Sequence, residues 1–362
     1  MRIAYLCSSL SLGGLELNQL KNASWMKNRG HHVYVMGVKD SPFYEQAKTL
    51  GLKTLEIRRH RKYYDFLGAL ALNALVKKHN IEKMFVRDTR DISIMATLKC
   101  LRRTKITTAY FMEMQLGVKK TNFLHTLRFS FLDFWFCPLP YLVDQVKSWT
   151  HVNPAKIFLV PSGIDTQGLE KIPASEARKH LQLESGVFYF GLIGRFDLQK
   201  GQLLLLEAIT HAKRSDFKVV FLGEPTKNEN NGVHEQMLTF IEKNHLTERV
   251  EIRPFMKDVG IFYCAINCLV MATKAETFGM VSLEAIAHGI PVIGSHLGGT
   301  PDLLHNEQFG RCFQSMNAQD LALKLDAMVG ENFQINPKEK DAFIGQFDQE
   351  KVCIAIENTL NP

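Results

Sequence analysis

Short apolar runs alternate with longer amphipathic segments along the chain, and turns rich in glycine separate them. The first apolar run is Ile3–Cys7, and a Ser/Gly-rich turn, a helical segment (Leu15–Arg29) and a second run (His32–Gly37) follow it. Strand, turn, helix and strand in this order predict a βαβ unit with parallel strands. Further strands are predicted at Leu52–Ile57, Lys83–Val86, Thr107–Phe111 and Phe134–Cys137, with helices at Phe66–His79 and Asp91–Cys100.

The same alternation restarts near residue 187 and predicts a second α/β half. Its strands are expected at Val187–Gly194, Lys218–Leu222, Val250–Pro254, Cys268–Met271 and Pro291–Gly294. Proline and glycine between residues 160 and 165 suit a linker. We therefore expect an N-terminal domain over residues 1–165, a C-terminal domain over residues 166–345, and a final helix within residues 346–362.

Composition indicates a globular protein. The chain has 362 residues, of which 46% are hydrophobic, enough for two cores. Its seven cysteines are scattered without a Cys-x-x-Cys pair, which argues against a zinc ribbon or a disulfide framework and favours a reducing compartment. No run reaches the roughly 18 apolar residues of a membrane span, and the apolar start is too short for a signal peptide. We expect a cytoplasmic protein, which could also lie peripherally on the inner face of the cell membrane.

Charge is distributed unevenly between the two halves. Residues 1–165 carry 25 Lys and Arg against 12 Asp and Glu, a net charge of +13, whereas the whole chain carries only +7. A basic half of this kind suits an anionic surface or substrate, and it suits ordinary solvated side chains equally well.

The segment Gly194–Gly201 carries two cations at the end of a predicted strand and reads Gly-Arg-Phe-Asp-Leu-Gln-Lys-Gly. Ligands of open α/β sheets bind at the carboxyl ends of strands, and Gly194 lets the backbone approach a ligand closely. Arg195 offers a fork of donors and Lys200 a point charge, and both suit a diphosphate. Taken alone, the segment could also be an ordinary charged loop.

A second motif, Glu276–Glu284, follows a predicted strand and reads Glu-Thr-Phe-Gly-Met-Val-Ser-Leu-Glu. Helix propensity rises from Met280, so Glu276 is expected in the loop before a helix and Glu284 inside it. The N-terminus of that helix can bind an anion through its amides. These amides belong to Phe278, Gly279, Met280 and Val281. The motif could thus offer amides to a phosphate and carboxylates to sugar and ribose hydroxyls; the alternative is two surface carboxylates.

Gly13 and Gly14 fall between the first strand and its helix, where their amides could meet a phosphate or an acceptor group. A Gly-Gly turn alone usually only makes the turn. The dinucleotide fingerprint Gly-x-Gly-x-x-Gly is absent from this turn. No Asp-x-Asp occurs in the chain, so the commonest short signal for a metal-bound diphosphate is missing.

Together these motifs resemble the retaining, nucleotide-sugar-dependent glycosyltransferases of family 4, which have the GT-B fold. The matching residues are Gly194–Arg195, Lys200–Gly201, Glu276–Val292, Gly298–Asp302, Gly13–Gly14, Glu16 and, for the inter-domain segment, residues 160–165. The C-terminal half matches over most of its length and the N-terminal half mainly at its first βαβ unit. The resemblance implies two Rossmann-like α/β domains facing a central cleft, with the C-terminal helix crossing back to the N-terminal domain.

The resemblance also implies roles for the site residues of the nucleotide-sugar domain. Arg195 and Lys200 would bind the donor diphosphate, with Gly194 beside them. Glu284 would bind the ribose. Glu276, with the amides named above, would hold the donor sugar and stabilise charge, so Glu276, Arg195 and Lys200 would carry the catalysis. No cofactor and no metal ion is expected.

On the acceptor side the resemblance is thinner. Gly13 and Gly14 would close on the diphosphate from the N-terminal, acceptor-binding domain. Many relatives carry a His in the loop after the strand Thr107–Phe111, and this chain has none there. Glu113 or Gln115 could position the acceptor, or the loop could be structural. No catalytic base is assigned, because in retaining transfer the leaving phosphate can take the acceptor's proton, which leaves electrostatics at the diphosphate as the main contribution.

Two basic, aromatic segments lie in the N-terminal half. A helix over residues 117–136 would carry an apolar stripe flanked by cations. The stripe comprises Phe123, Leu124, Leu127, Phe131, Phe134 and Trp135, and the cations are Lys119, Lys120 and Arg128. We expect the helix to bury this stripe on the sheet and the chain then to enter a strand at Phe134, with contact to an anionic membrane as the alternative. The second segment, Ile57–Tyr64, could bind acceptor phosphates, nucleic acid or nothing; no nucleic-acid partner is expected, since no reading motif accompanies it.

The function predicted from the resemblance is that of a retaining hexosyltransferase. It would move a hexose-type sugar from a nucleotide diphosphate, with UDP favoured over GDP, to a glycan or lipid-linked glycan in surface polysaccharide or glycolipid assembly. The alternatives are a sugar-nucleotide epimerase or a phosphorylase on the same fold, and a non-enzymatic protein that binds sugar nucleotides. The four charged residues of the donor motifs argue against the last.

Overall fold

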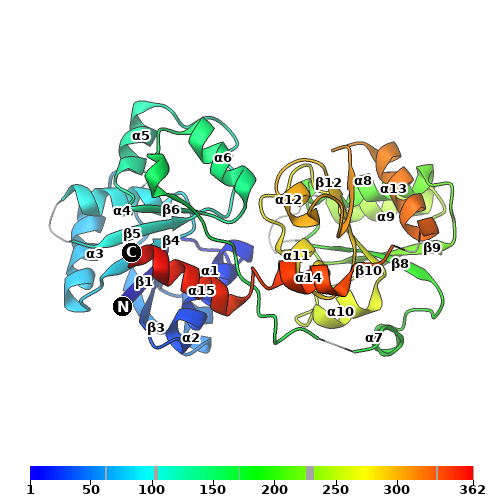
Figure 1. Ribbon diagram of the computed structural model, residues 1–362, viewed down its shortest axis with the longest axis horizontal. Coiled ribbons are helices and arrows are strands. Elements are labelled where there is room, and N and C mark those ends of the chain that lie inside the picture. Colours follow the sequence, from blue (N-terminus) through cyan, green and yellow to red (C-terminus); the bar gives the residue numbers. More distant parts are fainter. Residues whose placement is uncertain (62, 102–104, 171, 226–231, 332, 362) are drawn as a thin grey trace. The chain divides into compact units, whose positions relative to one another are not determined.

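In the computed structural model the chain forms two α/β units, each with its own parallel sheet (Figure 1). The structure describes residues 1–61, 63–101, 105–170, 172–225, 232–331 and 333–361, so Lys62 of the basic segment lies outside the described residues. One unit comprises residues 1–163 with 347–362 and the other residues 164–346, within two residues of the expected boundaries. All seven cysteines are free, and no helix of the described ranges is long and apolar enough to cross a membrane.

The sheet of the N-terminal unit has seven parallel strands in the order β3-β2-β1-β4-β5-β6-β7. They are β1 (Arg2–Cys7), β2 (His32–Val38), β3 (Lys53–Ile57), β4 (Lys83–Val86), β5 (Thr107–Phe111), β6 (Phe134–Cys137) and β7 (Ile157–Leu159). Every strand predicted for this half is present, and β7 is additional. The order reverses between β1 and β4, so the loops that follow these two strands lie side by side at the carboxyl edge.

Helices cover both faces of this sheet, and each face has its own core. One core takes its helical residues from α3 (Phe66–Lys78), α4 (Asp91–Cys100), α5 (Phe123–Ser130) and α6 (Pro140–Trp149). The other takes them from α1 (Gly14–Asn28), α2 (Pro42–Thr49) and α15 (Gln349–Leu360). The last of these is the predicted C-terminal helix, which packs against α1 as expected.

The C-terminal unit has six parallel strands in the order β10-β9-β8-β11-β12-β13. They are β8 (Phe188–Ile193), β9 (Phe217–Leu222), β10 (Val250–Arg253), β11 (Cys268–Met271), β12 (Val292–Ser295) and β13 (Gly310–Phe313). Its helices are α7 (Ala174–His180), α8 (Gln202–His211), α9 (Val233–Lys243), α10 (Gly260–Ala265), α11 (Met280–Ala287), α12 (Thr300–Leu304), α13 (Ala318–Glu331) and α14 (Pro337–Ile344). Two Rossmann-like domains are thereby confirmed.

The helix predicted ahead of the strand at Phe134 is shorter than expected and buries a different face, whereas the strand is present. Only residues 123–130 are helical, as α5, and Phe134 and Trp135 belong to strand β6. Phe123 is 75% exposed, whereas Phe129 is buried and stacks edge-on against Trp135 at 5.0 Å between ring centroids. The helix contacts α4, where Arg128 donates to Ser93, whereas Phe123 and Leu124 in its first turn are exposed.

A clamp of charged residues joins α15 to the end of α1. The Arg29 guanidinium donates from Nε and Nη2 to the two carboxylate oxygens of Glu357, both at 2.8 Å, and His31 Nε2 lies 2.8 Å from Oε1. The hydrogen bonds from Arg29 lower the pKa of Glu357 to about 2, with a smaller contribution from His31. The clamp supplements the apolar packing of α15, in which Val352, Cys353 and Ile356 are buried.

We predict that Glu357→Gln lowers the free energy of unfolding by about 1 kcal/mol at pH 7, because it removes a charge-assisted pair at a partly buried site. Since the folded-state pKa of about 2 lies below the ordinary value of 4.5, the contribution is complete above pH 4.5 and is lost as the pH falls towards 2. Urea unfolding of the variant and the wild type at pH 7 and at low pH measures it. Glu350→Gln is the control, because Glu350 is 70% exposed and 3.7 Å from Arg29. An equal loss in both variants at pH 7 would contradict the clamp.

Candidate functional site

The two sequence motifs meet at one edge of the C-terminal sheet. Strand order reverses between β8 and β11, which pair directly; the first motif follows β8 and the second follows β11. Such a reversal is where open α/β sheets bind their ligands. The contact between the motifs is the pair formed by Lys200 Nζ and Glu276 Oε2, 3.6 Å apart.

In the first motif, side chains hold the backbone by hydrogen bonds, and the guanidinium of Arg195 is exposed to solvent. Asp197 caps the short 3₁₀ turn Leu198–Lys200, accepting from the amide of Gln199 at 2.9 Å. The Gln202 side chain donates to Arg195 O at 2.9 Å, and the guanidinium of Arg195, 56% exposed, lies 3.5 Å from Asp197. Arg195 can therefore turn to an anion at the cost of only a long, solvated ion pair.

The second motif is held by the loop that follows β12. Glu276 O accepts from the amide of Gly299 at 2.7 Å. Gly298 has φ +77°, and a Cβ on it would lie only 2.2 Å from Glu276 O. Phe278, 3% exposed, anchors the loop in the core. Gly279 then begins α11 in a left-handed conformation, so the first-turn amides at Met280 and Val281 have no acceptor within the helix.

The carboxylate of Glu284 is oriented by a residue that the sequence did not indicate. The hydroxyl of Tyr263 in α10 donates to Glu284 Oε2 at 3.0 Å, and this hydroxyl also lies 3.2 Å from Val281 O. The ring of Tyr263 stacks on His288. Burial, together with the nearby carboxylate, raises the pKa of Tyr263 well above its ordinary value, so the hydroxyl remains a donor.

These groups can hold an anion and hydroxyl groups at the same time. Arg195, Lys200 and the first amides of α11 supply positive charge, and Glu276 and Glu284 supply hydrogen-bond acceptors. Within the described ranges no cluster of three or more His, Cys, Asp or Glu could hold a metal ion.

The remaining predicted residues lie in the N-terminal unit. The amide of Gly13 donates to Glu16 Oε2 at 2.8 Å, and Gly14 begins α1. Glu113 forms a buried ion pair with Arg87 and also accepts from Asn18 at 3.3 Å. A phosphate contact from these amides and a positioning role for Glu113 therefore stay predictions; the ion pair accounts for Glu113 structurally.

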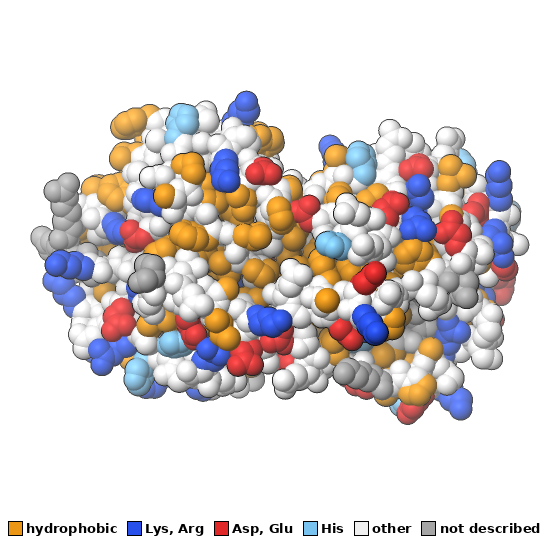
Figure 2. Space-filling view, viewed as in Figure 1, with side chains coloured by type: hydrophobic (Ala, Val, Ile, Leu, Met, Phe, Trp, Pro, Cys, Tyr) orange, Lys and Arg blue, Asp and Glu red, His pale blue; other side chains and the backbone are white. Residues whose placement is uncertain are grey.

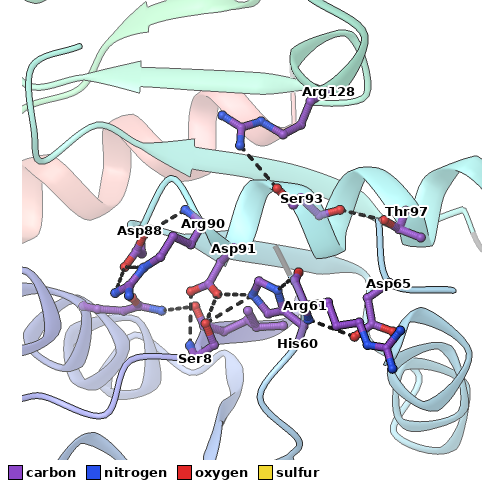
Figure 3. Close-up of polar contacts among 12 residues, drawn as sticks. Ser8, His60, Arg61, Asp65, Asp88, Arg90, Asp91, Ser93, Thr97 and Arg128 are labelled. Atoms are coloured by element: carbon purple, nitrogen blue, oxygen red, sulfur yellow. Dashed lines mark hydrogen bonds and ion pairs between the residues drawn. The ribbon is translucent and has the colours of Figure 1, made fainter. Parts of the chain in front are cut away.

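A buried polar cluster marks the reversal of strand order in the N-terminal sheet (Figure 3). Ser8 follows β1, His60 follows β3, and Asp91 begins α4. His60 Nε2 lies 2.8 Å from Asp91 Oδ1, His60 Nδ1 lies 3.0 Å from Arg61 O, and Ser8 donates to Asp91 Oδ1 at 2.5 Å. Burial lowers the pKa of His60, but the bonds to Asp91 and Arg61 O raise it more, so the net shift is upward. Both ring nitrogens of His60 face oxygen atoms that can accept a hydrogen bond, an arrangement that favours the charged form of the ring.

Comparison with known proteins identifies relatives of the C-terminal unit. Residues 174–344 match the family model of "Glycosyl transferases group 1". A D-inositol 3-phosphate glycosyltransferase of Mycobacterium sp. (strain KMS) is 25% identical over 188 residues, which are 51% of this chain and 42% of that relative. An uncharacterized glycosyltransferase of Methanocaldococcus jannaschii is 29% identical over 154 residues, 42% of this chain and 41% of the relative. The match thus spans less than half the length of these curated relatives.

Solved structures match over nearly the whole chain. Anabaena HepE in complex with UDP has a TM-score of 0.87 at 20% identity, with 99% of each chain covered. A glycosyltransferase from Rickettsia africae has a TM-score of 0.85 at 17% identity, covering 99% of this chain and 97% of that one. At these identities the likeness establishes a shared fold.

We predict that Gly298→Ala destabilises the protein more than Gly289→Ala does. Both glycines have φ near +80°, which costs any other residue about 1 kcal/mol, but a Cβ at Gly289 meets nothing within 4 Å. At Gly298 the Cβ would collide with Glu276 O and push the loop away. The difference between the two losses in unfolding free energy, measured in urea, reports that collision. Equal losses in the two variants would show that the loop of Gly298 does not pack against the loop of Glu276 as described.

Proposed function

Because residues 174–344 match the family model of glycosyl transferases group 1, we propose that the protein is a retaining glycosyltransferase. It transfers a hexose-type sugar from a nucleotide diphosphate to a glycan or lipid-linked glycan in surface polysaccharide or glycolipid assembly. The observation that supports this best is the pairing of Lys200 with Glu276 at the reversal point of the C-terminal sheet, which sets a cation for phosphate beside an acceptor for sugar hydroxyls.

The charged groups divide between the two parts of such a donor. Arg195 and Lys200 bind the diphosphate, because both can leave their present carboxylate partners, 3.5 and 3.6 Å away, for a doubly charged group. Glu276 then accepts from the sugar hydroxyls. Glu284, held by Tyr263, accepts from the ribose hydroxyls.

Catalysis in this proposal is electrostatic. The bond between the anomeric carbon and the phosphate oxygen breaks, the acceptor hydroxyl oxygen bonds to that carbon on the same face, and the hydroxyl proton passes to the leaving diphosphate. Negative charge therefore grows on the phosphate as the bond breaks. Arg195, Lys200 and the first amides of α11 stabilise it there, and removal of one such donor typically costs about 10²–10³ in rate.

Two observations favour the finer assignments. HepE, which shares the fold, has been solved with UDP and with UDP-glucose, so we favour UDP over GDP as the nucleotide.

Figure 2 shows hydrophobic side chains on the surface over α5, where Phe123 is 75% and Leu124 52% exposed. Lys119 and Lys120 precede them in the sequence, so this end of the N-terminal unit suits peripheral contact with an anionic membrane.

We expect UDP-sugars to stabilise the wild type thermally and the double variant Arg195→Ala/Lys200→Ala to lose both that stabilisation and transfer, the latter by at least about 100-fold. A thermal-shift screen of UDP-, GDP- and ADP-sugars and a transfer assay measure the two effects. Lys213→Ala is the matched control, because Lys213 is exposed in the loop before β9, at the opposite edge of the sheet.

Transfer by the folded double variant at the wild-type rate would contradict the diphosphate assignment. Absence of stabilisation by any of the three classes of nucleotide-sugar would contradict the proposed function itself.

A further inference from the structure

A cavity of about 660 Å³ opens at the carboxyl edge of the N-terminal sheet. Its walls come from the loops after β1, β3, β4 and β5 and from α4 and α5, and Ser8, Arg90 and Gln115 are among its lining residues. The volume is that of an ordinary ligand site. Gln115, which the sequence suggested as a positioning residue, therefore faces this cavity, whereas Glu113 is not among its lining residues.

The described lining of this cavity carries cations and no carboxylate. The cations are Arg59, Arg90, Lys120 and Arg128, with His60 and His125 beside them. Arg90 is paired with Asp88 and His60 with Asp91, so their charges are largely balanced. Arg59, Lys120 and Arg128 have no carboxylate partner in the described ranges of the chain. The cavity thus holds a surplus of positive charge, much as the +13 of residues 1–165 suggested.

Among the cations that line this cavity, Arg128 is the one on which the proposal depends. It reaches from α5 towards α4, where Nη1 lies 3.3 Å from Ser93 Oγ, and Figure 3 shows the guanidinium directed at that helix. Its Nε is buried without a hydrogen-bond acceptor among the described residues. Burial lowers the pKa of Arg128, since it disfavours the charged form, yet an arginine stays protonated. An anion in the cavity would offset part of the cost of burying this guanidinium.

A second, more apolar cavity of about 1070 Å³ adjoins the first and shares Arg59 and His60 with it. Residues of α3 line it, its apolar walls include Ile57, Phe66 and Leu72, and charged residues such as Glu56 and Asp65 also line it. Phe66 is 54% and Leu67 77% exposed at its rim. A molecule that filled both cavities would present an anionic group to Arg128 and an apolar chain to α3.

We propose that this pair of cavities binds an acceptor that carries a phosphate joined to an apolar chain, with Arg128 as the main ligand of the phosphate. The inference rests on the proposed function and adds the chemical class of the acceptor to it. The phosphate is favoured because its oxygens can accept from the guanidinium fork of Arg128 and from Arg59 or Lys120 together. The chain is favoured because the apolar cavity begins at the same two residues, Arg59 and His60, that close the charged one.

Octyl phosphate, inorganic phosphate and octyl glucoside, all below micelle-forming concentrations, test the proposal by calorimetric titration of the full chain without nucleotide. We expect octyl phosphate to bind at least about tenfold more tightly than inorganic phosphate, and octyl glucoside to bind more weakly than octyl phosphate. Arg128→Gln should weaken octyl phosphate binding by about tenfold or more. Arg128→Lys, which keeps the charge, should recover part of that loss.

Two further variants separate the cavities. Ala71→Trp fills the apolar cavity from an exposed position on α3, and should weaken octyl phosphate while leaving inorganic phosphate unchanged. Lys147→Gln removes an exposed cation from α6, outside the lining of either cavity, and should change neither. Unchanged melting temperatures and unchanged UDP binding confirm that each variant is folded.

Octyl phosphate that binds Arg128→Gln as well as the wild type, or no more tightly than inorganic phosphate does, would overturn the proposal, as would the absence of binding. Because no nucleotide is present, the result is independent of the donor site. If octyl phosphate does not bind but nucleotide-sugars do, the acceptor class is refuted and the proposed function stands. If the wild type binds no nucleotide-sugar, the proposed function itself is refuted.

Discussion

The direct pairing of β8 with β11 is the constraint on which the candidate site depends. Two motifs that lie far apart in the chain follow these strands, and only the reversal of strand order makes their carboxyl ends neighbours. From that adjacency follow the pair between Lys200 and Glu276 and the packing of the Glu276 loop on Gly298. Tyr263 then fixes Glu284 from a third element. The candidate site therefore depends on sheet topology as much as on residue identity.

Most of the fold could be predicted from the sequence because buried parallel strands are continuous apolar runs. The segment Val187–Gly194 is such a run, and β8 occupies it almost residue for residue. Strands without a run were missed: β7 is three residues long and only partly buried, and β13 reads Gly-Arg-Cys-Phe. Ser41 caps α2 and Pro42 is its first residue, and this Ser-Pro pair could have predicted the start of the helix.

The residues of the candidate site also differ in whether the sequence could predict them. Arg195, Lys200, Glu276 and Glu284 could be named because each lies in a local motif at a strand end. Tyr263 could not, because α10 is a single short helix without an amphipathic period. The stripe at Phe123 failed for another reason: helical periodicity identifies a face but not the neighbour that covers it, and α4 covers the face with Phe129.

The N-terminal unit shows the same topological logic with different chemistry. Its reversal point, between β1 and β4, places Ser8, His60 and Asp91 together although they come from three separate segments. Asp91 is fully buried and lies 2.8 Å from His60 Nε2, and Asp88 pairs with Arg90. Asp88 and Asp91 thus pair with Arg90 and His60 but do not line the cavity themselves, so the side chains that line it carry positive charge.

The central claim is that the loops after β8 and β11 together form a site for a nucleoside diphosphate. Hydrogen–deuterium exchange of the full chain with and without UDP tests it most directly. The account predicts slower exchange on UDP binding in residues 194–201 and 276–284, and unchanged exchange in residues 212–216 at the opposite edge of the same sheet. Protection of only one of the two motifs, or saturating UDP that protects neither, would contradict it.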